Sequence, residues 1–176
     1  ASVGSAVAEL RLPNLFTDHM ILQQETRNTV WGTADAGGKV TVAASWGAEE
    51  TATADAEGRW KLHLDTPSHG TGHGLTIRSG EDERVISDVA IGEVWLCAGQ
   101  SNMGWAVRMT FGGEEEAASA DMPDLRIFRS SREHWHEPLD FSRDRLSCWQ
   151  PCDPDSAAHC SAVSYFFAKK LHQELG

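Results

Sequence analysis

Apolar residues recur at every second position through much of the first half of the chain. The members of this pattern are Val40, Val42, Ala44, Trp60, Leu62, Leu64, Leu75 and Ile77. Because side chains along a strand point alternately to opposite faces, a period of two predicts short, half-buried strands in an antiparallel sheet. No stretch of residues 1–87 has the period of a helix.

Glycine-containing turns separate these strands. Residues 35–38 and 55–58 each end in glycine, where a hairpin needs a positive φ. Residues 67–74 form a loop with three glycines and two histidines. Short strands with this regular spacing predict a β-sandwich of immunoglobulin-like or jelly-roll-like size over residues 1–87.

The pattern changes after Asp88. Residues 89–98 are almost continuously apolar, which is typical of a strand that is covered on both faces. A second short apolar run lies at residues 125–128. Apolar residues at every fourth position predict a helix over residues 161–175, with its first residue as N-cap. This order of elements predicts the start of an α/β layer over residues 88–176.

Composition and charge narrow the class of protein. The chain has 176 residues, of which 40% are hydrophobic and 23% charged, a mixture that folds. Asp and Glu number 26 against 15 Lys and Arg, so the formal net charge is −11. That balance excludes nucleic acid and anionic membrane surfaces as expected partners, because both attract basic faces. No apolar stretch approaches the ~20 residues of a membrane-spanning helix.

The four cysteines leave their pairing open. Cys97 lies in the apolar run, and we expect a buried free thiol there. Cys148, Cys152 and Cys160 cluster near His159, but their spacing fits no tight zinc knuckle. In an exported protein, a local disulfide from Cys148 to one of the other two is favoured over zinc. We expect no metal and no cofactor.

The first residues bear on localisation. Residues 1–8 are small and apolar, and residues 6–8 (Ala-Val-Ala) resemble a cleavage motif. They lack the basic and long apolar regions of a signal peptide. We therefore expect a secreted or periplasmic protein whose signal peptide is absent from this chain.

The seven tryptophans, against one tyrosine, are a compositional hint of carbohydrate handling. Trp31, Trp60 and Trp95 fall in strand phase, so we expect them in the core. Trp46 and Trp135 lie near loop ends, where packing is favoured over stacking on a sugar ring. The acidic run at residues 114–116 is expected to be a solvated helix start.

The sequence Gly99-Gln100-Ser101-Asn102 directly follows the apolar run. A strand that ends in glycine can turn sharply into a helix, which puts the serine at the carboxyl edge of the sheet. The Ser101 N–H then lies at a helix N-terminus and can stabilise an oxyanion. A serine nucleophile also needs a base, usually a histidine that a carboxylate orients.

A plainer interpretation is that Ser101 only caps a helix, since serine is a preferred N-cap. The motif also lacks the second glycine of the Gly-x-Ser-x-Gly elbow, so it is not an α/β-hydrolase signature. Spacing by itself therefore favours the capping role over the nucleophile.

Three separated blocks resemble one family. Residues 92–103 (Gly-Glu-Val-Trp-Leu-Cys-Ala-Gly-Gln-Ser-Asn-Met) resemble the nucleophile block of the sialate O-acetylesterase family, carbohydrate esterases within the SGNH hydrolase group. Residues 12–24 with 30–32 resemble the opening strand region of that family. Residues 161–168 resemble the helix after its first α/β unit. The blocks occur in the family's order and span most of the chain.

The resemblance implies a β-sandwich followed by the N-terminal part of an SGNH-type α/β hydrolase domain. It implies that Ser101 is the nucleophile and that its N–H is an oxyanion-hole donor. Gln100 and Asn102 would brace the turn or touch substrate, and Trp105 would wall the pocket. The chain departs from the family at Gly104, where glutamate is usual, and at Cys160, where an aromatic residue is common.

The family's other catalytic groups are not recognisable in the chain. These are a Gly/Asn pair of the oxyanion hole and an Asp-x-x-His-like pair. We expect none of the eight histidines to be the base: His19, His63, His69, His73, His134, His136, His159 and His172. The resemblance thus implies an O-acetylesterase of sialic acid or another acetylated glycan, inactive as this chain alone. Its Asp and His would lie on a missing downstream segment or companion chain. The alternative is a non-catalytic carbohydrate-binding β-sandwich module.

Overall fold

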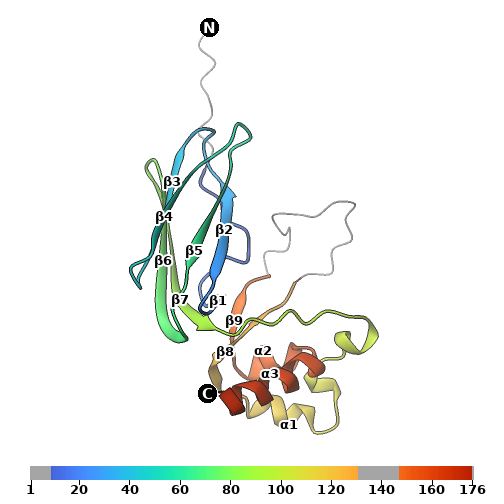
Figure 1. The fold of residues 1–176 in the computed structure, drawn as a ribbon. Coiled ribbons are helices and arrows are strands. Elements are labelled where there is room, and N and C mark those ends of the chain that lie inside the picture. Colours follow the sequence, from blue (N-terminus) through green and yellow to red (C-terminus); the bar gives the residue numbers. More distant parts are fainter. Residues whose placement is uncertain (1–8, 131–146, 176) are drawn as a thin grey trace. The chain divides into compact units, whose positions relative to one another are not determined.

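The computed structural model describes residues 9–130 and 147–175, which group into two compact units (Figure 1). The described residues of unit 1 are 9–93 and 147, and those of unit 2 are 94–130 and 148–175. Strands predominate over helices in the described ranges. Among the helices of these ranges, none has both the length and the apolar character needed to cross a bilayer.

Unit 1 contains two sheets. The larger has five strands in the order β1-β7-β6-β3-β4, and the smaller is the antiparallel pair β2–β5. All neighbours in the larger sheet are antiparallel except β1 and β7, which run parallel with Ile21 opposite Ala90. The strand bounds are β1 Ile21–Gln23, β2 Arg27–Thr33, β3 Lys39–Ala44, β4 Glu49–Thr53, β5 Arg59–Asp65, β6 Gly70–Ser79 and β7 Asp82–Gly92.

The apolar residues at every second position of the sequence form one buried face on each of these two sheets. Along β5, Trp60, Leu62 and Leu64 are buried while the residues between them are exposed. On the larger sheet the buried positions include Val40, Val42, Leu75, Ile77 and Ile86. The alternation is therefore confirmed as the source of the core of unit 1, and the predicted glycine turns lie between β2 and β3 and between β4 and β5.

A polar pair joins the start of β1 to β7. His19 and Asp88 both have a left-handed backbone, with φ of 67° and 51°. The His19 Nδ1 lies 2.7 Å from the Asp88 Oδ2, and the His19 N–H donates to the Ser87 carbonyl at 3.1 Å. Next to them, the Asp18 carboxylate accepts the Ser87 N–H at 2.7 Å. These bonds hold two unfavourable backbone conformations where the parallel strand β1 begins.

Unit 2 consists of short elements around a small core. Its elements are the 3₁₀ turns η1 Ser101–Gly104 and η2 Val107–Met109, the helices α1 Gly113–Ala118, α2 Pro154–His159 and α3 Ala162–Leu175, and the antiparallel strands β8 Met122–Phe128 and β9 Trp149–Cys152. Helix α2 begins with a capping box, in which Asp153 and Ser156 exchange side-chain and backbone hydrogen bonds, and Pro154 follows the cap.

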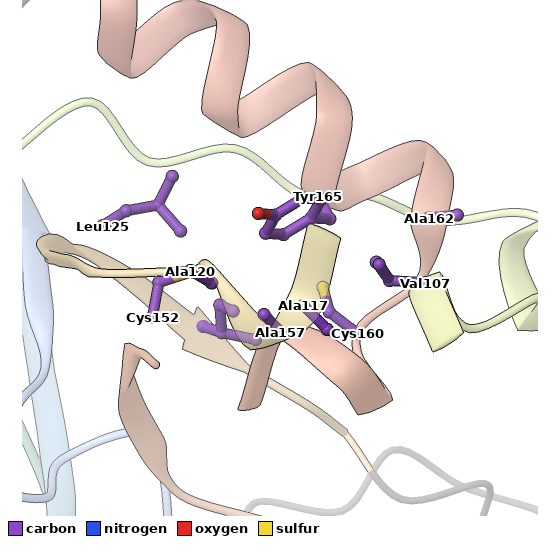
Figure 2. Packing of buried hydrophobic residues seen from close by; sticks show 10 residues of the cluster. Val107, Ala117, Ala120, Leu125, Cys152, Ala157, Cys160, Ala162 and Tyr165 are labelled. Carbon is purple, nitrogen blue, oxygen red and sulfur yellow. The ribbon is translucent and has the colours of Figure 1, made fainter. Parts of the chain in front are cut away.

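The core of unit 2 is built mainly from small residues that surround one aromatic ring. Tyr165 is 1% exposed and projects from α3 toward Ala117 of α1 and Ala157 of α2 (Figure 2). The Tyr165 hydroxyl donates to Glu116 Oε1 at 2.7 Å, and Lys169 also donates to that oxygen. This pair of donors lowers the pKa of Glu116, and burial raises the pKa of Tyr165. Glu116 thereby ties α1 to α3.

Several predictions for the second half are confirmed and others are wrong. The helix over residues 161–175 is present as α3, and the apolar run at 125–128 lies in β8. The acidic start of α1 is solvated at Glu114 and Glu115. Glu116, by contrast, is partly buried and accepts hydrogen bonds from Tyr165 and Lys169, and we call these three residues the Glu116 cluster. The Ser161 hydroxyl does not cap α3, because its Oγ is buried without a hydrogen-bond partner among the described residues.

The apolar run at residues 89–98 divides between the two units. Its first part completes β7, which ends at Gly92, five residues after the junction near Ser87 that the sequence suggested. The rest is not a buried strand: Trp95 is 58% and Leu96 93% exposed. The prediction of a strand covered on both faces fails at these residues because no described strand pairs with them. The β-sandwich and the α/β layer remain predictions.

The cysteines also differ from expectation. All four are free, so the local disulfide is not formed, and Cys97 is exposed together with the run around it. Cys152 and Cys160 are buried in the core of unit 2. Burial raises the pKa of both thiols to about 11, which keeps them protonated and unreactive at neutral pH.

The left-handed pair at His19 and Asp88 predicts a graded response to substitution. Changing Asp88 to Ala removes the bond to His19 and leaves a left-handed alanine, which should lower the free energy of unfolding by about 1–2 kcal/mol. Changing Asp88 to Asn keeps a side chain that tolerates this conformation and can still bond, so the loss should be smaller. Urea denaturation of the three proteins would measure the difference. Equal losses would contradict the assigned role of the backbone conformation.

The Glu116 cluster predicts a pH-dependent contribution to stability. Because the pKa of Glu116 is lowered in the folded chain, its contribution is present above the ordinary glutamate pKa of about 4.3 and is lost as pH falls below it. Changing Glu116 to Gln should remove this acid sensitivity, and changing it to Ala should cost about 1–3 kcal/mol because the Tyr165 hydroxyl loses its acceptor. Thermal unfolding between pH 3 and pH 7 would test both, with Glu115 to Gln as an exposed control.

Candidate active site

Ser101 occupies a sharp backbone turn. Its φ is +50°, a left-handed conformation that serine rarely adopts and that costs of order 1–3 kcal/mol. The N-cap of η1 is Gln100, with extended backbone and no capping bond from its side chain, so Ser101 is the first residue of the turn itself. The structure therefore places Ser101 after the cap, and the alternative that it serves as the N-cap is wrong.

Gly99 lies in close contact with the side chain of Met103. A Cβ built on Gly99 would lie 2.7 Å from Cγ of Met103, nearer than side-chain carbons approach in folded proteins. The Met103 N–H in turn donates to the Gln100 carbonyl at 3.3 Å. The chain thus folds back tightly around Ser101, and a side chain at position 99 would force the Met103 side chain to move.

The Ser101 side chain is exposed, as are Gln100 and Asn102 on either side of it. Within residues 9–130 and 147–175 its hydroxyl makes no hydrogen bond. The element that begins at Ser101 is a single 3₁₀ turn, where the sequence had suggested a longer helix with a dipole. Any stabilisation of negative charge at this point would therefore come from local N–H groups.

Trp105 closes the turn and is held at both ends. Its N–H donates to the Asn102 carbonyl at 3.1 Å, and its indole Nε1 donates to the Met109 carbonyl at 3.0 Å. Its side chain is nevertheless 52% exposed. The structure therefore fixes an exposed aromatic ring four residues after Ser101.

A short backbone ladder attaches this segment to the start of α3. The Ala162 N–H donates to the Trp105 carbonyl at 2.8 Å, and the Val107 N–H donates to the Cys160 carbonyl at 3.0 Å. Ala106 and Ser161 pair as an antiparallel bridge between these bonds. The Trp105 carbonyl thus satisfies one of the free N–H groups at the helix start. Val107, fully buried, anchors the same ladder in the core.

The loop after Trp105 displays side chains that the sequence analysis did not single out. Met109 is 52% exposed and Phe111 is fully exposed, and Arg108 between them is exposed as well. The signal that could have drawn attention to them is the Gly112-Gly113 pair. A Cβ on Gly113 would lie 1.8 Å from the Val107 carbonyl oxygen, so the chain must turn sharply after Phe111.

An apolar surface lies along the described part of α3. Trp95 packs edge-on against Phe167 with 5.2 Å between ring centroids. Val163, Phe166 and Phe167 of the helix are each more than 40% exposed, and so are Val94 and Trp95 of the run before Ser101. We call these five residues the apolar surface of unit 2.

The histidines of unit 2 do not supply a base for Ser101 among the described residues. His159 Nδ1 lies 2.9 Å from the Asp155 carbonyl, within its own helix. His172 lies near the end of α3. His134, His136 and Trp135 are outside the described residues. The residues that the structure brings together with Ser101 are therefore Gln100, Asn102 and Trp105, and an acid–base partner is not among them.

No family model matches the chain, but several curated proteins have a similar sequence. The sialate O-acetylesterase of Mus musculus is 28% identical over 187 residues, which cover 97% of this chain and 35% of the relative. That of Rattus norvegicus is 29% identical over 181 residues, covering 94% and 33%. The chain thus spans about a third of the length of these curated relatives.

A solved structure agrees with the sequence relatives. The crystal structure of a carbohydrate acetylesterase from Xanthomonas citri matches with a TM-score of 0.88 and 32% identity, over 95% of this chain and 38% of that one. The sequence similarity and the structural similarity both extend over nearly the whole of this chain. Over nearly its whole length, the chain is therefore similar to sialate O-acetylesterases and to a carbohydrate acetylesterase.

Proposed function

We propose that this chain carries the nucleophile of an esterase that removes O-acetyl groups from sialic acid or another acetylated glycan. The observation that carries the proposal is the left-handed backbone of Ser101 in a chain related to O-acetylesterases. Strained residues concentrate at functional sites, where the surrounding structure holds them. Gly99 and the hydrogen bonds of the 105–107 segment are what hold Ser101 here.

The proposed reaction is acyl transfer in two steps. The Ser101 Oγ attacks the acetyl carbonyl carbon, while a base takes the Oγ proton and the backbone N–H of Ser101 donates to the developing oxyanion. The C–O bond to the sugar breaks, and the protonated base returns the proton to the sugar oxygen. Water then attacks the acetyl-serine with the help of the same base, which releases acetate and restores the serine.

Gln100, Asn102 and Trp105 are proposed as supporting residues. Gln100 and Asn102 flank the nucleophile with exposed amide side chains that can brace the turn or bond to substrate. The Trp105 indole, fixed by its bond to the Met109 carbonyl, offers a rigid wall beside the acetylated sugar. No cofactor or metal is part of the proposal.

The base and its carboxylate are proposed to come from a downstream segment or a companion chain. Support comes from the apolar surface of unit 2, since exposed aromatic and aliphatic side chains in contact with one another mark a surface that another element covers. The relatives are about three times as long as this chain, so they contain sequence that could supply such an element. We further propose that the protein acts outside the cytoplasm, on extracellular glycans.

Replacing Ser101 with Ala in the polypeptide that holds the complete hydrolase domain should lower turnover of an aryl acetate by at least about 10³-fold. The fold should remain intact, because alanine at this position keeps the same backbone requirement as serine. Hydrolysis would be followed by release of the phenol. Changing Ser119, an exposed serine of unit 2, to Ala should leave turnover unchanged.

Covalent labelling gives an independent test of the nucleophile. An organophosphonate should modify Ser101, and peptide mass spectrometry would locate the adduct. If the chain instead escaped labelling and bound acetylated and deacetylated glycans equally, the result would favour a carbohydrate-binding module and contradict the esterase.

The close contact at Gly99 predicts a second effect on activity. Changing Gly99 to Ala pushes a methyl group into Met103 and should cost about 1–3 kcal/mol of stability. Because the displaced turn carries Ser101, kcat for an aryl acetate should fall by about tenfold or more. Combining the change with Met103 to Ala opens the space and should restore part of kcat. No recovery in the double variant would show that the steric contact is not the cause.

A further inference from the structure

The first half of β7 has a partner strand on one side only. Strand β6 pairs with β7 from its first residue onward, whereas β1 pairs with it only at residues 90–92. A two-residue turn connects β6 to β7, so the pair of Ser79 and Asp82 that flanks the turn is hydrogen-bonded, and so is every second pair after it. The backbone N–H and carbonyl of Val85 therefore point away from β6, to a side where no described strand pairs with them.

Hydrogen bonds at both ends limit the length of this open edge. At one end, the Leu10 N–H donates to Asp82 Oδ2 at 3.0 Å. At the other end, the Ser87 N–H donates to Asp18 Oδ1 at 2.7 Å, and the Ser87 carbonyl accepts the His19 N–H at 3.1 Å. The open edge between these bonds is only a few residues long. It therefore favours a compact ligand over a long added strand, which would need free backbone groups along its whole length.

A cavity of about 430 Å³ lies at this open edge. It is lined by residues 9–12, 16–18 and 84–86, all of which belong to unit 1. Its volume lies within the usual range of small-ligand sites, about 300–1,000 Å³. Part of the lining is apolar, because it includes the buried ring of Phe16 and the side chain of Val85, which is 62% exposed.

The charged side chains that line the cavity balance one another. Arg11 and Arg84 are matched by Glu9 and Asp18, and Arg84 already pairs with Glu9. A charged ligand would meet repulsion as well as attraction, whereas a neutral ligand with hydroxyl groups can bond to both kinds of side chain, because a hydroxyl donates and accepts. Thr17 also lines the cavity, and its buried Oγ1 has no hydrogen-bond partner among the described residues.

We propose that this cavity of unit 1 binds a neutral sugar unit. The hydroxyls of the sugar bond to Arg84, Asp18 and the backbone groups of Val85, and an apolar C–H face of the ring lies against the side chains of Val85 and Phe16. The site binds a glycan without acting on it, and a second binding site of this kind raises the effective concentration of the glycan at the protein. The inference goes beyond the proposed function, because it requires neither an acetyl ester nor Ser101.

Titration of the full chain with three neutral sugars tests the site. The probes are the methyl glycosides of glucose, galactose and mannose, which carry no acetyl ester and so cannot be consumed by an esterase. At least one of them should shift the backbone amide NMR signals of residues 84–86 in a saturable manner, with a Kd on the order of 1 mM. Tetra-alanine is the comparison ligand, and it should cause no saturable shift.

Two substitutions should weaken the binding of the sugar. Changing Arg84 to Gln should raise Kd by about tenfold, because it removes a charge-assisted hydrogen bond. Changing Val85 to Pro should raise Kd by about threefold or more, and the sheet should tolerate it because the lost N–H points away from β6. Changing Arg78 to Gln is the matched control, because Arg78 is an exposed arginine of the same hairpin that pairs with Glu83 and does not line the cavity. It should leave Kd unchanged.

The outcomes separate this inference from the proposed function. No saturable shift at residues 84–86 with any of the three sugars would overturn the site. Equal Kd values in the Arg84, Arg78 and unchanged proteins would also overturn it, as would saturable binding of tetra-alanine in place of the sugars, which would indicate strand addition. If the Val85 to Pro variant does not fold, the Arg84 and Arg78 pair decides the question. Loss or retention of turnover in the Ser101 to Ala variant has no bearing on these results.

Discussion

The backbone pairing of residues 105–107 with residues 160–162 is the constraint on which the candidate site depends. Two hydrogen bonds and one antiparallel bridge attach the segment after Ser101 to the start of α3. The partners are more than fifty positions apart in sequence, so the entropy of closing that loop must be offset by burial of Val107 and Tyr165 in the core. This pairing holds the end of the turn that carries Ser101, and the bonds from Met103 to Gln100 and from Trp105 to Asn102 hold the turn itself.

The same pairing explains why the side chains around Ser101 are both rigid and exposed. Backbone bonds and the tight packing at Gly99 and Gly113 fix the chain, so its side chains need not be buried to be ordered. Catalytic and binding groups require this combination, since a group must be positioned and must also reach a ligand. The thiols of Cys152 and Cys160 are buried in the core of unit 2, and their raised pKa values keep them protonated. They therefore contribute to packing and not to a reaction.

In unit 2, a run of apolar residues that is typical of a buried strand does not form one. The apolar run at Val94, Trp95 and Leu96 has the composition of a buried central strand, yet its residues are exposed in the described structure. A strand is stabilised by neighbours that take its hydrogen bonds and cover its faces, and composition cannot provide them. Within the described residues, Trp95 of this run packs edge-on against Phe167 of α3.

The sequence by itself determined the elements whose signal is local. The alternation at Trp60, Leu62 and Leu64 became a half-buried strand, and the four-residue period of Phe167 and Leu171 became α3, because side-chain direction follows directly from backbone geometry. The resemblance around Ser101 likewise rested on contiguous residues. Tertiary structure alone decided the exposure of Cys97 and Trp95, the burial of Glu116 and the display of Arg108, because each depends on which distant segments lie next to it.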